Sequence, residues 1–455
     1  MKILGLSAVI PCARQDVAGV TAVHVVIYSL LDELTRLGHQ VVYQPVFTRH
    51  RASETLAPFE QESIQALAAR GIDVLPPISA SSYLNGGGRG VAGQFSRLGA
   101  LLGGTRLAHF YPSVSVAPQI SAVVDRHRPD VALTFWSPEA VAATHGVESL
   151  PCVSYQGDVD FVPGRTRQSE PALFFPARNG SLRDRLDRVR SGLWYAEAAR
   201  AHLRLMRGVA CIANVTAANA DYYTAQGHPR AVYARNTWPD PGPSRLAPLT
   251  APATGPFKII GHVGYLDRTG STYGLKFLLT DVMPHLRQTL AGLDYEVHII
   301  GGGQPVPALR PLLKQERLVV RGFVEDLEAE FASSSAMLVL NGASPYRCAY
   351  TRHLVAWSHR LCLIVHEYSR GAIPEIVHLE NALVGRTGAE VAEQIRVALT
   401  DPATNAKVRQ GGLRTYQQYF TPAAVAKGLE SELQVAVSTH RSGRSAQAPA
   451  PSRVG

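Results

Sequence analysis

Short apolar runs alternate with amphipathic stretches along most of the chain. Residues 2–10 form an apolar run, residues 19–37 carry apolar side chains at helical spacing before Gly38, and residues 40–46 form a second run. The same alternation starts again at Lys258. Strands and helices that alternate in this way predict parallel sheets covered by helices. We therefore predict an α/β protein with two doubly wound, Rossmann-like domains.

The stretch between the two alternating halves is rich in proline and has no period. At 455 residues the chain is too long for a single hydrophobic core, so two domains and a linker are expected. The predicted division is an N-terminal domain at 1–237, a linker at 238–256 and a C-terminal domain at 257–422. An apolar helix is predicted at 423–438, and a disordered basic tail at 439–455.

The charge of the chain narrows the classes of partner. A hydrophobic content of 46% with 18% charged residues indicates a folded globular protein. The formal net charge of +9 suits anionic partners, but the arginines are scattered and lack the aromatic and basic stripes of a nucleic-acid surface. We therefore expect no nucleic acid. A phosphorylated small molecule, an anionic membrane face and a simply solvated basic surface all remain open.

The cysteines and the apolar runs bear on the compartment. Five cysteines lie far apart without a C-x-x-C pair, which is typical of reduced packing residues and not of zinc ligands. The first apolar run is too short for a signal sequence, and no run approaches the roughly 20 residues that span a bilayer. We expect a cytoplasmic protein, with peripheral contact at the inner membrane face as the alternative.

A loop at residues 371–377 combines glycine, proline and glutamate directly after a buried strand. It reads Gly-Ala-Ile-Pro-Glu-Ile-Val, and Glu-Asn-Ala-Leu-Val follows at 380–384. This line resembles the donor-site segment of GT-B nucleotide-sugar glycosyltransferases of group 1, the retaining family 4 type. The resemblance implies two domains facing a cleft, a C-terminal helix that packs back on the N-terminal domain, and a donor site. Its donor-binding residues would include Gly371, Ile373, Pro374 and Glu375.

The same loop has a second interpretation. Glycine and proline also fit an ordinary strand-to-helix turn. In either case the loop is expected to lead into a helix N-terminus, whose amides can face an anion.

Two further loops extend the resemblance. After the strand at residue 258, the family often holds the donor diphosphate with an arginine and a Lys-Gly pair. This chain offers only Arg268 and the backbone amides from Gly264 onward, which could equally form a simple turn. A later line, Gly322-Phe323-Val324 before an acidic helix cap, matches the family pattern beside the donor base.

One family feature is missing. Retaining members carry two glutamates separated by seven residues, for the donor sugar and the ribose. The matching positions here hold Arg347 and Val355. Arg347, Arg352 or Arg360 would then supply charge for the diphosphate, and at most two of them can share one face of the predicted helix.

The acceptor side is predicted from the N-terminal half. The strand at 152–155 ends in Gln156-Gly157-Asp158, and ligands of open α/β sheets sit beyond such strand ends. Asp158 could orient or deprotonate an acceptor hydroxyl, or cap the following segment. Gly19 stands in the first loop, where the family brings backbone close to the ligand.

The predicted activity is transfer of a sugar, as a hexosyltransferase, from a nucleotide-diphosphate sugar to a hydroxyl of a glycan, lipid or small molecule. Retention of configuration follows from the resemblance alone, and neither a cofactor nor a metal is expected. The alternatives are a sugar-nucleotide epimerase and a degenerate protein that binds sugar nucleotides or serves as a scaffold.

Two further segments each allow two interpretations. Residues 79–104 are rich in glycine and serine, as in a mobile loop over the acceptor or a plain surface insertion. The arginine-rich helix at 182–207 presents either a solvated face or a membrane-attracted one.

Overall fold

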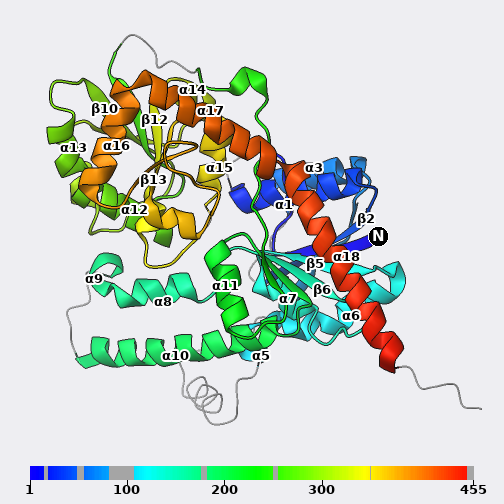
Figure 1. The fold of residues 1–455 in the computed structure, drawn as a ribbon. Helices are drawn as coiled ribbons and strands as arrows, with labels where there is room; N and C mark the ends of the chain where they lie inside the picture. Colours follow the sequence, from blue (N-terminus) through cyan, green and yellow to red (C-terminus); the bar gives the residue numbers. More distant parts are fainter. Residues whose placement is uncertain are drawn as a thin grey trace, which may run out of the picture.

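The computed structural model describes residues 1–14, 19–48, 56–80, 107–175, 182–248, 255–348 and 350–447. Two parallel sheets lie one above the other in Figure 1, each with helices on both faces. The predicted segment at 79–104 lies almost wholly outside the described residues. The two-sheet α/β architecture predicted from the alternating pattern is confirmed.

The N-terminal sheet is wholly parallel and has a doubly wound strand order. In spatial order its strands are β3 (Asp73–Val74), β2 (Gln40–Thr48), β1 (Lys2–Ser7), β5 (Val131–Phe135), β6 (Cys152–Gln156), β7 (Cys211–Asn214) and β8 (Ala231–Tyr233). A short strand β4 (Ile78–Ala80) also pairs with β2. Every residue of β5, β6 and β7 is buried, as expected for central strands covered on both faces.

The helices of this domain follow the strands in the expected alternation. They are α1 (Ala22–Arg36), α3 (Pro58–Ala69), α5 (Leu107–Phe110), α6 (Ala117–His127), α7 (Pro138–Ala143), α8 (Val162–Ser169), α9 (Pro171–Phe174), α10 (Leu182–Met206) and α11 (Ala217–Ala225). Of these, α8 and α9 extend under the C-terminal domain in Figure 1. Leu173 of α9 packs into the hydrophobic core of that domain, so the two domains share apolar contacts.

The C-terminal sheet is built in the same way. Its strands, in spatial order, are β11 (Leu318–Gly322), β10 (Tyr295–Ile300), β9 (Phe257–Val263), β12 (Ala336–Val339), β13 (Leu363–His366) and β14 (Leu383–Gly385). The helices are α12 (Thr269–Phe277), α13 (Met283–Thr289), α14 (Leu327–Ala332), α15 (Thr351–Ser358), α16 (Gly388–Thr400), α17 (Pro402–Tyr419) and α18 (Pro422–Gln447). Helix α12 continues into α13 through a π turn at Leu278–Val282.

Helix α18 crosses from the C-terminal domain and runs down the side of the N-terminal domain (Figure 1). His39 Nε2 lies 3.0 Å from Glu430 Oε1, and Arg230 lies 2.7 Å from Glu432 Oε2. Arg441 reaches Asp130 at 2.7 Å, so the start of the predicted disordered tail is helical up to Gln447. The prediction of disorder from residue 439 onward was therefore wrong for these first residues.

One other expectation about local structure was wrong. No helix comes after the loop at 371–377, because turns lead from it directly into β14. The anion-binding helix start expected at that loop is thus absent from this described segment.

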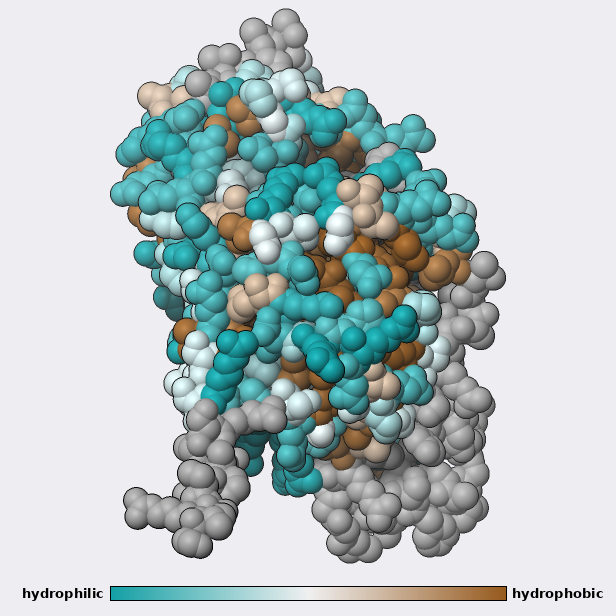
Figure 2. Space-filling view, turned by 90° about the vertical axis from the view of Figure 1, so that its right-hand side faces the viewer, coloured by the Kyte–Doolittle hydropathy of each residue, from teal (hydrophilic) through white to brown (hydrophobic). Residues whose placement is uncertain are grey.

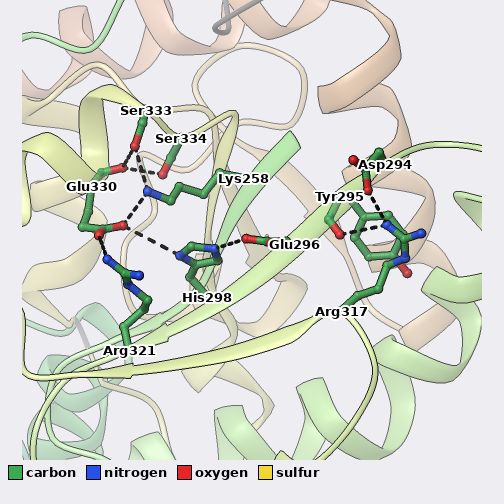
Figure 3. A network of polar contacts seen from close by, with 10 residues as sticks. All are labelled: Lys258, Asp294, Tyr295, Glu296, His298, Arg317, Arg321, Glu330, Ser333 and Ser334. Carbon is green, nitrogen blue, oxygen red and sulfur yellow. Dashed lines mark hydrogen bonds and ion pairs between the residues drawn. The ribbon is translucent and has the colours of Figure 1, made fainter. Parts of the chain in front are cut away.

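A charged cluster fixes α14 on the C-terminal sheet (Figure 3). Lys258 Nζ of β9 lies 2.6 Å from Glu330 Oε2, and Arg321 of β11 lies 3.0 Å from Glu330 Oε1. Burial raises the pKa of the Glu330 carboxyl, but the Lys258 and Arg321 charges outweigh burial and leave the pKa below its usual value. The cluster therefore holds Glu330 ionised and ties the helix to two strands.

The surface is mixed in character. The face shown in Figure 2 is mostly hydrophilic, with hydrophobic residues gathered toward its middle. Within the described ranges, no helix is long and apolar enough to cross a bilayer.

Candidate active site at the junction of the domains

Arg352 stands in the first turn of α15 and reaches across the ends of the C-terminal strands. Its guanidinium donates to Asn341 Oδ1 at 2.9 Å and to Ser271 Oγ at 2.9 Å, both neutral side chains. Among the described residues it forms no ion pair. Enclosure by protein lowers its pKa to about 10, although the side chain keeps some exposure. A cation that is desolvated without a carboxylate partner is arranged to receive an anion.

Arg409 shows what a purely structural buried arginine looks like in the same domain. It is 1% exposed and donates to Asn405 Oδ1 at 2.5 Å and to three backbone carbonyls at 2.7–2.9 Å. These acceptors satisfy most of its donors, and burial lowers its pKa as well. Among the described residues Arg352 donates to two such partners, which leaves further donors of its guanidinium for a ligand.

The first turn of α12 lies beside Arg352. Ser271, which accepts from Arg352, is the third residue of this helix. Arg167 of α8, from the other domain, donates from Nε to Thr269 Oγ1 at 2.7 Å. A Cβ at Gly270 would overlap the hydroxyl of Tyr350, so this glycine lets Tyr350 cover the turn. Two guanidinium groups, one from each domain, therefore meet at a helix N-terminus, where the helix dipole also favours an anion.

The strand ends next to this turn are packed backbone to backbone. Gly264 N–H donates to Ile300 O at 3.0 Å, and Gly301 N–H donates to Gly322 O at 2.7 Å. Gly301 has φ +138°, and a Cβ there would collide with the carbonyl of Gly264. A Cβ at Gly264 itself would lie 3.2 Å from the Arg352 guanidinium. These glycines allow the loops after β9, β10 and β11 to pack closely together, and Gly264 leaves room for the Arg352 guanidinium.

Asp158 approaches the same junction from the end of β6. Its carboxyl lies beside the thiol of Cys348 in the C-terminal domain, and Oδ1 is buried without a hydrogen-bond partner in the part of the chain that the structure describes. Burial raises the pKa of Asp158 to about 6. Asp160, two residues on, is turned instead toward the Tyr111 hydroxyl at 3.4 Å. Asp158 is thus the carboxyl of this pair that meets the other domain, with a pKa suited to proton transfer near neutral pH.

Arg347 lies in a loop before α15 and not in a helix, contrary to the prediction. Its guanidinium carbon stands 4.3 Å from the centre of the Tyr368 ring, and Nη1 donates to Ser344 O at 3.4 Å. The nearest atoms of its side chain would lie 3.6 Å from a Cβ at Gly371. Like Arg352, it forms no ion pair within the described residues, and it brings positive charge to the predicted donor loop.

Glu375 is held by the N-terminal domain. Its carboxylate accepts from Arg235 Nε at 2.6 Å and from the Tyr233 hydroxyl at 2.9 Å. In the same loop, the carbonyl of Ala372 accepts a hydrogen bond from the Ala217 N–H at 3.1 Å. Ile373 is buried beneath it, whereas Pro374 is exposed. The structure therefore assigns Glu375 two partners across the junction, and direct contact with a ligand stays a prediction.

Other predicted residues are placed less centrally. Gly157 packs against the Trp136 indole, and Gln156 is buried with its amide on Ser154 Oγ at 2.5 Å. Gly19 is exposed before α1 and lies near Phe59. These positions shape the N-terminal side, and the described contacts bring none of the three to Arg352.

The remaining residues predicted for the donor side lie at three separate places. Arg268 is exposed at the start of α12, with its guanidinium 5.5 Å from the Tyr265 ring. Phe323 is 68% exposed beside Gly322 and Val324 at the end of β11, as a base-stacking residue would need to be. Arg360 follows α15 and donates to Ala247 O of the linker at 2.7 and 2.9 Å, so it does not join Arg352.

Sequence reasoning missed three residues that complete the site, Arg167, Asn341 and Tyr350, and it considered Ser271 only for its backbone amide. Arg167 belongs to a different domain from the turn that it reaches. The one available signal for Arg167 was its place shortly after Asp158, on the segment leaving β6.

Comparisons with known proteins give the family model that matches part of the chain and the fold that the whole chain shares. Residues 257–401 match the family model described as "Glycosyl transferases group 1". No curated protein matches the sequence. Among solved structures, a glycosyltransferase from Rickettsia africae ESF-5 superposes with a TM-score of 0.57 at 12% identity, covering 96% of this chain and 98% of that one.

Two further structures cover almost the whole chain. Sucrose-phosphate synthase from Thermosynechococcus elongatus gives a TM-score of 0.58 at 12% identity, over 96% of this chain and 99% of that one. HepE from Anabaena, solved with UDP-glucose, gives 0.58 at 13% identity, over 96% and 100%. At identities this low, the superpositions establish the fold alone. The chain has the two-domain GT-B fold of glycosyltransferases. Within that fold, residues 257–401 of the C-terminal half form a group 1 glycosyltransferase domain.

Proposed function

We propose that this protein transfers a sugar from a nucleotide-diphosphate sugar to a hydroxyl acceptor at the junction of its two domains. The observation that carries the proposal is the pair of guanidinium groups, Arg352 and Arg167, on the first turn of α12. In such a transfer the nucleoside diphosphate leaves with its negative charge, which cations and helix amides stabilise. Because these cations come from the protein itself, the proposal requires neither a metal nor a cofactor.

Asp158 is the proposed group on the acceptor side. It lies on the N-terminal domain beside Cys348 of the other domain, and among the described residues its Oδ1 has no hydrogen-bond partner. A carboxylate with a pKa of about 6 is mostly ionised at pH 7 and can accept a proton from an acceptor hydroxyl. The acceptor would be a glycan, lipid or small molecule that presents a hydroxyl at this position. Retention of configuration stays an expectation from the family resemblance.

We also propose that the protein acts in the cytoplasm. All five cysteines are free thiols, and four of them are buried, which suits a reducing compartment. Peripheral contact with the inner membrane face is part of the same proposal.

The test is binding followed by turnover. Melting curves would be recorded with UDP, GDP and dTDP, starting with UDP because HepE was solved with it. A ligand at 100 times its dissociation constant adds about 2.7 kcal/mol to stability. We expect a shift with at least one diphosphate, followed by consumption of the matching sugar nucleotide only when an acceptor is present.

The same experiments separate the alternatives. Interconversion of sugar nucleotides without an acceptor would identify an epimerase. Binding without turnover across an acceptor panel would identify a protein that only binds the ligand. A melting curve unmoved by every diphosphate would count against the donor site itself.

A further inference from the structure

Helix α10 carries a row of exposed apolar side chains. Leu182, Leu186, Val189 and Leu193 are 74%, 61%, 63% and 52% exposed. Their spacing of four, three and four residues places them on one stripe of the helix. In Figure 1 the helix lies along the lower edge of the N-terminal domain, away from both sheets. Single apolar residues are common on protein surfaces, but a continuous row on one helix marks an interaction surface.

Arginines border this stripe, whereas the acidic side chains lie behind it. At 3.6 residues per turn, Arg185 stands about 60° to one side of Leu182 and Arg190 about 80° to the other. Both are exposed and form no ion pair among the described residues. Asp184 and Asp187 fall about 140–160° away from the stripe, on the partly buried side of the helix. The outward face is therefore apolar in the middle and cationic at both borders.

The same face becomes cationic toward the end of the helix. Arg200, Arg204 and Arg207 continue the direction of the stripe, and all three are exposed. Arg200 also pairs with Glu197 one turn earlier. The apolar half and the arginine half of this face thus follow each other along one side of the molecule.

We propose that α10 docks the protein on the surface of a bilayer that contains anionic phospholipids. Leucine and valine side chains would enter the boundary between headgroups and acyl chains, while the arginines bind lipid phosphates beside them. A second copy of this chain fits less well, because two such stripes packed together would bring arginine borders against each other. The charge pattern therefore favours an anionic surface over self-association.

The docking helix is connected to the site through α8. Gly164 of α8 packs against Tyr195 of α10, where a Cβ would lie 2.5 Å from the tyrosine oxygen. Helix α8 also carries Arg167 to Thr269 across the junction. A protein bound through α10 would therefore hold one wall of its site at the membrane. Vesicle binding can be measured without nucleotide sugar, so the test does not depend on the proposed reaction.

The experiment is co-sedimentation of the full chain with vesicles. Wild-type protein should bind equimolar phosphatidylglycerol and phosphatidylcholine, bind pure phosphatidylcholine far less, and release as salt is raised. Leu186→Glu with Leu193→Glu should weaken binding by about tenfold or more. Arg185→Gln with Arg190→Gln should also weaken it, by roughly fivefold per arginine.

The matched control variants make the same kinds of substitution outside α10. Val320→Glu alters a side chain that is 48% exposed on β11, and Arg126→Gln with Arg414→Gln removes two exposed arginines outside α10. Both controls should bind vesicles as the wild type does.

Three results would overturn the proposal. In the first, the wild type does not bind the anionic vesicles. In the second, the control variants lose as much vesicle binding as the α10 variants. In the third, sedimentation velocity without lipid shows a dimer of the wild type that is absent from the Leu186→Glu, Leu193→Glu variant. The third result would assign the stripe to a second copy of the chain.

Discussion

Replacing Arg352 by methionine should strongly weaken binding of the diphosphate while leaving the stability of the empty protein nearly unchanged. Methionine keeps most of the aliphatic length and removes the guanidinium. The loss comprises hydrogen bonds to Asn341 and Ser271, each worth about 1 kcal/mol. Against this, the change removes a cation that is desolvated without a carboxylate partner, and apolar replacement of buried charges is often neutral or stabilising. We expect the free energy of unfolding without ligand to change by less than about 1 kcal/mol.

The effect on binding should be large. Charge-assisted hydrogen bonds contribute about 1.5–3 kcal/mol each, so two contacts to a diphosphate correspond to at least about 3 kcal/mol, or roughly a hundredfold in Kd. Ligand at 100 times the wild-type Kd stabilises the wild type by about 2.7 kcal/mol. At the same concentration it would stabilise the variant by only about 0.4 kcal/mol. Differential scanning fluorimetry and titration calorimetry measure both quantities.

Arg409→Met is the matched control. It would leave the Asn405 side chain and the Pro248, Ser334 and Ser335 carbonyls without their donor, at a cost of about 3 kcal/mol or more in stability. Ligand affinity of the remaining folded protein should be unchanged. The opposite pattern, in which Arg352→Met unfolds readily yet still binds diphosphates, would refute the assignment of Arg352 to the ligand.

Three further outcomes are expected. Wild-type kcat/KM should rise with pH through about 6, as the Asp158 carboxyl, whose pKa is raised by burial, loses its proton; Asp158→Asn should be nearly inactive with a flat profile. If the ion pair between Glu375 and Arg235 is what matters, Glu375→Gln and Arg235→Met should each lower kcat to a similar extent, and the double variant should lose no more than either single one. If Glu375 instead contacts the ligand, only the Glu375 change should be severe. Because its neighbours hold the pKa of Glu330 below the usual value, the stability this group contributes is present above about pH 4.5 and is lost as pH falls through the folded pKa. Urea unfolding should therefore show Glu330→Gln less stable than wild type by about 1–3 kcal/mol at pH 7, with the difference shrinking toward pH 3.

The architecture could be predicted from the sequence because its signals are local. Apolar runs such as β5 and β12 are buried along their whole length, and they are identified as strands because they are too short for helices. The loop at 371–377 was misjudged because glycine and proline mark a turn but do not determine whether a helix or a strand comes after it. There, Asn381 donates to Glu375 O at 2.7 Å and accepts from Val377 N–H at 2.8 Å, which closes the chain into turns instead of a helix.

The site itself could be predicted only in part. Arg352 and Asp158 stand in or beside segments that resemble a known family, so the sequence pointed to them. Arg167 and Tyr350 act through contacts between residues far apart in the chain, such as Arg167 with Thr269, and no local pattern encodes such a contact. The role of Glu375 was hidden for the same reason, since its partners Tyr233 and Arg235 belong to the other domain.

These cross-domain contacts bear on how the reaction would be confined to the assembled site. The turn that would bind the diphosphate takes one guanidinium from each domain, and the loop beside it is held through Glu375 by the N-terminal domain. Asp158 meets Cys348 only where the domains touch. Separation of the domains would therefore remove Arg167 from the leaving group and Asp158 from the acceptor in one movement. Cations and base would be assembled together only when the domains enclose the substrates, which protects the activated sugar from water.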